Sequence, residues 1–442
     1  MASLPNRSPK FRAMLKREVP AWVQEGILTD DGAERLNARY QLDHLGKESS
    51  RLLAAVLFTI GGLLLGGGVI SFVTAHWEEI PVSVKVALLL AVLLAFHLTG
   101  YWLRYARGSP RLGHALIFCG CLVFGANIGL FAQIFHVSGD WYRAFGAWAI
   151  GSLAMAWAAR SWLTGVLVLA TSFTWFVGFA ADHHERLAAI YPFLLAATLL
   201  SLAWMIRSRV LETLTFLGVI SALAILAGIE ANSSRSVLLA AIAGGFLAWA
   251  VGEFHRTTGV REEFGNPVAS LGIVALAVGA YVWSFRSMWK WDRGDWHGGA
   301  SWLIPVGAAI VIGTALSAKA WPLMSRAQRR LSLSIVLASL ILSGCPVLSQ
   351  MSRSSVALPT IGANLAALIF AATGLGRGIV EERRADFWFG SLLLVLLITS
   401  RFLEYDTSLL LKSAAFIIGG AAVMLAGIAY ERFLRRKEAV AP

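Results

Sequence analysis

The sequence predicts an all-α fold, a polytopic integral membrane helix bundle with about fourteen transmembrane helices and a small N-terminal cytoplasmic helical hairpin. Of the 442 residues, 57% are hydrophobic and only 14% are charged, whereas about a quarter are charged in an ordinary soluble domain. The chain also holds 42 glycines and 17 tryptophans; in membranes glycine allows close helix contact and tryptophan anchors helices at the interface. This composition excludes a soluble enzyme, a coiled coil and a disordered tail.

The first domain, residues 1–50, is expected to form the cytoplasmic hairpin. Trp22, Leu36 and Tyr40 lie among apolar residues that are spaced for one face of two short helices, and Gly26 separates the two. One interpretation is a surface that docks a cytoplasmic protein partner or a second subunit. The other is an amphipathic collar that packs on the bundle or on lipid headgroups.

The second domain, residues 51–431, is expected to form the transmembrane bundle. A spanning helix needs about 20 mostly apolar residues, and the chain offers about fourteen such segments between short polar connections. They lie near 52–74, 84–103, 113–135, 144–159, 162–181, 187–206, 211–230, 236–254, 267–285, 301–320, 331–349, 355–376, 387–403 and 408–430. Twelve or thirteen spans stay open, because only Arg160 and Ser161 separate the fourth segment from the fifth and prolines interrupt later ones.

Basic residues set the predicted orientation. Most of the 38 lysines and arginines fall on the inner side if the N-terminus is cytoplasmic, and the basic tail, residues 432–442, then lies in the cytoplasm too. Arg286, Lys290 and Arg293 are the exception, since they fall outside. The net charge of +12 comes from these short clusters between apolar segments, so the bilayer and not a nucleic acid is the expected partner.

Polar residues are scarce at mid-depth. The predicted helix centres hold no Asp or Glu, which disfavours a relay of buried carboxylates. His97 is expected to bond a nearby backbone carbonyl, and Asn127 and Asn364 are expected to hold helices together. Gly125 and Gly129 have the spacing of a close helix crossing. We expect packing and not chemistry from these residues.

The candidate site lies at the predicted outer face, where histidines, acids and tryptophans gather between helices. The predicted binding residues are His76, Trp77, Glu78, Gln133, His136, Asp140 and Trp141. Imidazole and carboxylate groups together suit zinc, and the metal set would be His136, Asp140, His183 and His184. Solvated loop residues are the alternative interpretation, because no pair has a fixed helical spacing. No catalytic residue and no cofactor is assigned.

Three stretches resemble a known family, namely Trp22-x-x-x-Gly26-Ile27-Leu28, Ala75-His76-Trp77 and Gln133-Ile-Phe-His136-Val-Ser138-Gly139-Asp140. Their order is similar to that in the bacterial membrane proteins of the domain-of-unknown-function 2157 family, most clearly over residues 15–160. The resemblance implies a multi-pass protein of the bacterial inner membrane. It leaves the activity open.

Three functions follow from this pattern. The first is transport or flipping of a small polar solute or a lipid-linked intermediate, which about fourteen spans with short loops would suit. The second is a non-catalytic scaffold or sensor that acts through the cytoplasmic hairpin. The third is a membrane enzyme with an outer His and acid site, which is disfavoured because no phosphate-binding loop or nucleophile motif occurs in a suitable context. An oligomer is compatible with all three.

Overall fold

The computed structural model describes residues 9–40, 79–182, 185–291, 300–351, 356–404 and parts of 413–432. Every regular element in these ranges is a helix, so the all-α prediction is confirmed there. The predicted span 52–74 and the predicted site residues at 76–78 and 183–184 lie outside the described residues.

The first of two compact units covers residues 1–88. Its helices α1 (Pro9–Gln24) and α2 (Asp30–Tyr40) pack together through the buried side chains of Leu15 and Val19. Gly26 lies in the turn between them at φ +75°, a left-handed conformation that favours glycine. Ile27, next to it, stays 69% exposed and so lies outside the packed face of the two helices.

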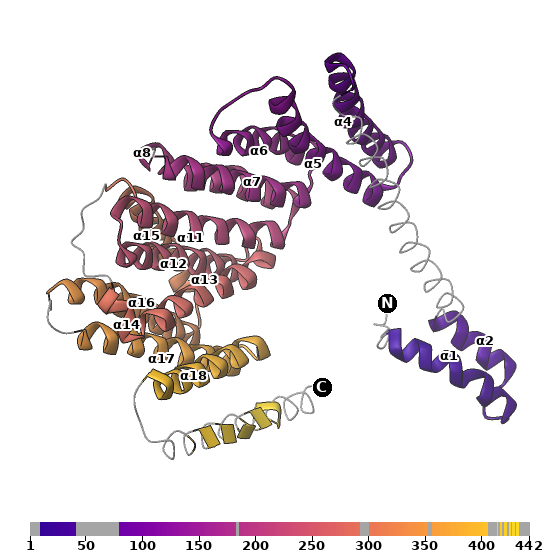
Figure 1. Ribbon diagram of the computed structural model, residues 1–442. Coiled ribbons are helices and arrows are strands. Elements are labelled where there is room, and N and C mark those ends of the chain that lie inside the picture. Colours follow the sequence, from indigo (N-terminus) through magenta and orange to yellow (C-terminus); the bar gives the residue numbers. More distant parts are fainter. Residues whose placement is uncertain are drawn as a thin grey trace. The chain divides into compact units, whose positions relative to one another are not determined.

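The second unit covers residues 89–442 and so begins inside α4, and its helices stack one beside the next (Figure 1). Their order is α4 (Val82–Tyr105), α5 (Pro110–Ile134), α6 (Trp141–Ala158), α7 (Trp162–Ala181), α8 (Glu185–Ala188), α9 (Tyr191–Leu195), η1 (Ala196–Leu200), α10 (Ser201–Ile206), α11 (Arg209–Ala231), α12 (Ser234–Thr258), α13 (Glu262–Trp283), α14 (Arg286–Trp291), α15 (Leu303–Ala320), η2 (Trp321–Leu323), α16 (Arg326–Met351), α17 (Ala357–Val380) and α18 (Arg384–Glu404).

Eleven helices among the described residues are long and apolar enough to cross a membrane. The continuous segment Arg186–Ile206 counts as one of them, and α6 is not among them. The short connection predicted between α6 and α7 is present, because Arg160 adopts φ +46° and Ser161 Oγ accepts a hydrogen bond from Thr164 N at 3.3 Å. A multi-pass membrane bundle is therefore supported, and the count of fourteen stays a prediction.

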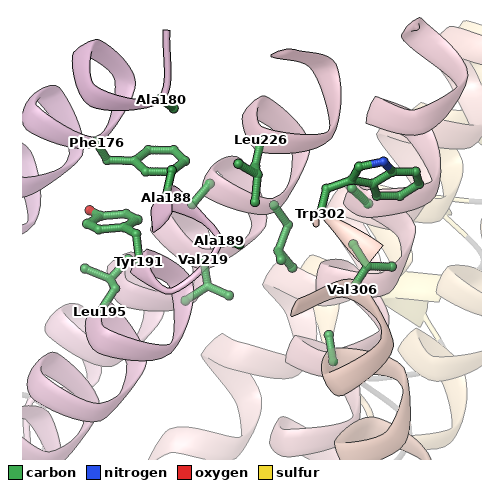
Figure 2. Packing of buried hydrophobic residues seen from close by; sticks show 14 of the residues in the cluster. Phe176, Ala180, Ala188, Ala189, Tyr191, Leu195, Val219, Leu226, Trp302 and Val306 are labelled. Carbon is green, nitrogen blue, oxygen red and sulfur yellow. The ribbon is translucent and has the colours of Figure 1, made fainter. Parts of the chain in front are cut away.

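The core is centred on α11 and α12. Over the most apolar 18 residues of each helix, 61% of the residues in α11 and 67% of those in α12 are buried, against 6% in α4. Most of the surface of α4 therefore faces its surroundings and not other helices. Figure 2 shows the packing beside α11: the rings of Phe176 and Tyr191 stack with centroids 4.4 Å apart, and Leu226 and Trp302 continue the same cluster. Large aromatic side chains thus fill the space between neighbouring helices.

Glycines let α12 and α13 meet backbone to backbone. A Cβ atom added to Gly272 would lie 2.3 Å from Trp249 N, and one added to Gly252 would lie 2.3 Å from Ala269 N. Only glycine fits such a crossing. Of the two glycines predicted at a close helix crossing, Gly125 packs closely, since a Cβ there would lie 2.2 Å from the Trp148 ring. A Cβ at Gly129 would meet no atom within 4 Å.

Candidate functional site

The described part of the predicted outer site is the turn between α5 and α6. Gln133 and His136 are exposed there, Trp141 is 61% exposed, and Asp140 is half-buried at the start of α6. His136 adopts φ +50°, which is uncommon for a residue with a side chain. The structure therefore places Gln133, His136 and Trp141 on the surface, and the role of Asp140 depends on its neighbours.

Asp140 belongs to a polar cluster that joins the start of α6 to the end of α7. Arg143 Nη2 lies 2.7 Å from Asp140 Oδ2. The buried Tyr142 places its hydroxyl 2.9 Å from Asp182 Oδ2 and 3.3 Å from Asp140 Oδ2. A phenol has one proton, so it donates to one carboxylate at a time. The cluster fixes the relative position of two helix ends, and the sequence indicated neither Tyr142 nor Arg143.

A cavity of about 590 Å³ begins beside this cluster, between α6, α7, α9 and η1. Its walls are mostly apolar, and Arg143 is the charged residue that lines it. The lining follows α6 from Arg143 to Leu153, a length of about 15 Å at 1.5 Å per residue, or roughly half of a 30 Å hydrocarbon core. Ile150 is 73% exposed and Leu194 54%. The cavity is therefore a groove on the outside of the bundle, and we call it the α6–α9 groove.

Few polar groups face the α6–α9 groove. Ser172 Oγ lies 3.1 Å from the Tyr191 hydroxyl, so these two groups satisfy each other. Thr198 lies on the wall in the π-helical η1 and donates its hydroxyl to Leu194 O at 2.7 Å. π-helical turns often occur at functional sites because they alter which side chains face a cavity. The groove thus offers a ligand apolar surface along its length and a guanidinium at one end.

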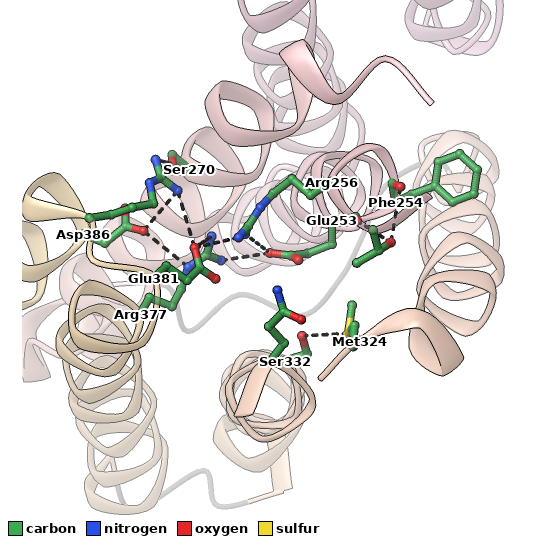
Figure 3. A network of polar contacts seen from close by, with 12 residues as sticks. Glu253, Phe254, Arg256, Ser270, Met324, Ser332, Arg377, Glu381 and Asp386 are labelled. Atoms are coloured by element: carbon green, nitrogen blue, oxygen red, sulfur yellow. Dashed lines mark hydrogen bonds and ion pairs between the residues drawn. The ribbon is translucent and has the colours of Figure 1, made fainter. Parts of the chain in front are cut away.

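A buried ion network joins α12 to α17 and α18 (Figure 3). Glu253 Oε1 lies 2.8 Å from Arg256 Nη1 and 3.1 Å from Arg377 Nη1. Glu381 Oε2 lies 2.6 Å from Arg256 Nη2, and the group is completed by Arg383 and Asp386, whose closest atoms lie 3.2 Å apart. Three arginines face three carboxylates, so the six charges balance. Each of these charges has an opposite charge beside it, so removal of one member would leave a charge without compensation in the interior.

Further along α12, a second buried pair lies against α11. Glu212 and His255 are both almost fully buried, with His255 Nε2 at 3.5 Å from Glu212 Oε1. Trp204 Nε1 donates a hydrogen bond to the same carboxylate oxygen at 3.3 Å, and His255 Nδ1 lies 2.6 Å from Val260 O. The sequence places these charged residues at helix ends, where a residue is usually solvated. Their burial depends on contacts between helices, and no local pattern indicates it.

The three polar residues predicted at mid-depth make the expected bonds. His97 Nδ1 lies 2.9 Å from Leu93 O, Asn127 Nδ2 donates to Leu89 O at 3.0 Å, and Asn364 Nδ2 donates to Ser284 O at 2.9 Å. The two asparagines thus link α5 to α4, and α17 to the end of α13. They act as interhelical contacts, as predicted.

The predicted metal set stays a prediction. Within the described ranges, no three His, Cys, Asp or Glu side chains gather closely enough to hold a metal ion. His136 and Asp140 are described, but His183 and His184 are not. The geometry that is visible favours ion pairing of Asp140 with Arg143.

Comparison with known proteins gives a family match in the N-terminal part of the chain. No curated protein matches the sequence, and no solved structure matches it. A family model does match, and its range includes the end of α1, the helices α2, α4, α5 and α6, and the turn that carries Asp140. Residues 20–165 match the family described as "Predicted membrane protein (DUF2157)", as the three sequence stretches predicted.

Proposed function

We propose that this membrane protein binds lipid-linked molecules in the α6–α9 groove and moves their headgroups across the bilayer. The observation that carries the proposal is the groove itself: about 590 Å³ of mostly apolar space, open at the exposed side chains of Ile150 and Leu194, with Arg143 at one end. An acyl or prenyl chain entering from the membrane would meet apolar walls over about half of the bilayer thickness.

The groove lining favours a lipid over a small polar solute. A polar solute would lose its hydration on entry, and unpaired polar groups cost several kcal/mol, on the order of 2–7. The hydroxyl groups of Ser172 and Tyr191 bond each other and so offer little compensation. A hydrocarbon chain makes no hydrogen bonds to lose, and it would move from the apolar bilayer core into an equally apolar groove.

Arg143 favours an anionic headgroup. Its guanidinium has five donors, suited to phosphate. Asp140 pairs with Nη2 of Arg143, and the Arg143 side chain is 72% exposed. Other N–H donors of the guanidinium are therefore accessible to a ligand. In the predicted topology this end of the groove lies at the outer leaflet, where a translocated headgroup would be released.

The test uses the full chain in vesicles of phosphatidylcholine and phosphatidylglycerol, with fluorescent phosphatidylglycerol in both leaflets and dithionite added outside. Dithionite quenches the inner-leaflet label only if lipids cross. Ala147→Trp should slow this loss strongly, because Ala147 is an exposed residue on the groove wall and the indole would fill the space. Ala144→Trp is the matched control, since Ala144 is exposed on the same helix but does not line the groove.

Two results would contradict the proposal. One is a lipid transfer rate no higher than in vesicles without protein. The other is equal transfer by the Ala147→Trp and Ala144→Trp proteins, which would show that the groove is not the path. Arg143→Gln should lower transfer of phosphatidylglycerol more than that of phosphatidylcholine, because only the former has a net negative charge.

A further inference from the structure

A second cavity, of about 240 Å³, lies between α4, α5 and α6. Four of its lining residues carry an atom that can bind a metal ion: His97 on α4, Cys121 on α5, and Ser152 and Met155 on α6. The other lining residues are Leu93, Leu94, Phe124 and Gly151. It is distinct from the α6–α9 groove, because the two cavities use different residues of α6.

The imidazole of His97 is positioned as a ligand. Nδ1 lies 2.9 Å from Leu93 O, and a hydrogen bond to this carbonyl holds the proton on Nδ1 and leaves a lone pair on Nε2. Such a bond is the usual outer support of a metal-binding histidine. Gly120 makes room for the ring, because a Cβ at that position would lie 2.5 Å from His97 Cε1.

Two further polar groups of this cavity are deeply buried. Cys121 is 1% exposed and Ser152 is fully buried, and the Ser152 hydroxyl interacts with the Cys121 thiol. A metal ion bound at the sulfur would keep this contact, because a thiolate accepts a hydrogen bond from the same hydroxyl. Met155, on the same helix as Ser152, adds a thioether to the cavity wall.

We propose that His97, Cys121 and Met155 bind a Cu(I) ion, with the Ser152 hydroxyl donating to the thiolate. Imidazole, thiolate and thioether are the ligands that select this soft ion. On binding, the Cys121 S–H bond breaks, its proton leaves to solvent, a Cu–S bond forms, and copper stays Cu(I). The site goes beyond lipid transfer and does not depend on it.

Charge balance favours Cu(I) over a divalent ion. No Asp, Glu, Lys or Arg lines the cavity. A thiolate and Cu(I) together are neutral, whereas a thiolate and Zn²⁺ would leave one positive charge in a low-dielectric interior, which is costly. The site should therefore discriminate against zinc although its ligand types alone would tolerate it.

The experiment titrates the detergent-purified full chain with Cu(I) in competition with bicinchoninate, without oxygen. We expect one Cu(I) per chain in the wild type, none in Cys121→Ser, and weaker binding in His97→Gln and Met155→Leu. Cys119→Ser is the matched control, because Cys119 lies on the same helix but does not line the cavity, and its Cu(I) binding should equal the wild type's. Zn²⁺ should not displace the bound Cu(I).

X-ray absorption of the copper-loaded wild type gives a test that needs no variant. Sulfur and nitrogen ligands are expected around copper, and size-exclusion chromatography checks that each variant is folded. The proposal is overturned if the wild type fails to compete with bicinchoninate, if copper shows no sulfur ligand, if folded Cys121→Ser still binds one Cu(I), or if Cys119→Ser loses binding equally.

Discussion

Arg377 Nη1 lies 3.1 Å from Glu253 Oε1, which joins α17 to α12 across 124 residues of sequence. Both side chains are almost fully buried. The contact is part of the balanced network of three arginines and three carboxylates, so each member is stable there only while the opposite charges remain. It links two helices that carry much of the core of the second unit.

Removal of one charge from this pair should strongly destabilise the protein. Arg377→Gln or Glu253→Gln leaves an uncompensated buried charge, at a cost of about 3–5 kcal/mol. The double variant keeps the charges of the network balanced, so its loss of stability should be smaller than the sum of the losses in the two single variants. Thermal unfolding in detergent, followed by circular dichroism, measures this.

Arg384→Gln is the control for that prediction. Arg384 lies near the network but its side chain is 57% exposed and its partner Glu431 is 3.5 Å away, so its loss should hardly change the melting temperature. Strictly additive single and double variants would show that Arg377 and Glu253 do not interact.

The crossing of α12 and α13 should not accept a methyl group. Gly272→Ala places a Cβ 2.3 Å from Trp249 N, and the helices must then separate, at a cost of roughly 1–3 kcal/mol. Gly307→Ala is the control, because a Cβ there meets nothing within 4 Å and alanine favours a helix over glycine by about 1 kcal/mol. Unfolding temperatures that fall equally in both variants would argue against a close crossing.

The His136→Gly variant tests backbone strain and metal binding at the predicted outer face with two different measurements. Its φ of +50° favours glycine, so His136→Gly should raise the melting temperature slightly. If the metal set with Asp140, His183 and His184 were real, the same variant would lose zinc. Metal analysis of the purified wild type and variant measures this: a lower zinc content in His136→Gly would support the predicted set, and an equal content would show that His136 is not a zinc ligand.

The sequence predicts the elements of this fold better than its polar contacts. The segment predicted at 162–181 coincides with α7, and Pro192 and Pro359 fall in the first turns of their helices, where the missing N–H costs little. Apolar length and proline position act locally, so a single sequence reveals them. The count of spans is harder, since α6 carries too many polar and aromatic residues to be distinguished by hydropathy.

The candidate site was predicted only in part, for a physical reason. Asp140 is predictable because it ends a short polar turn between two long apolar segments, which is a local feature of the sequence. Its neighbours Tyr142 and Asp182 meet only after α6 folds back on α7, 40 residues apart. The α6–α9 groove and the Glu253 network likewise form between helices that are distant in the chain. The spacing of residues along the sequence therefore does not predict them.

The π-helical turn at residues 196–200 holds one residue more than an α-helical turn needs. Deletion of the exposed Ala197 would let the turn close as ordinary α-helix, and the fully buried Leu202 and Ala203 would keep their places in the core. Insertion of one residue would instead rotate the helix that follows by about 100°, and would carry those side chains out of the core. This part of the sequence should thus accept a single-codon deletion and exclude an insertion.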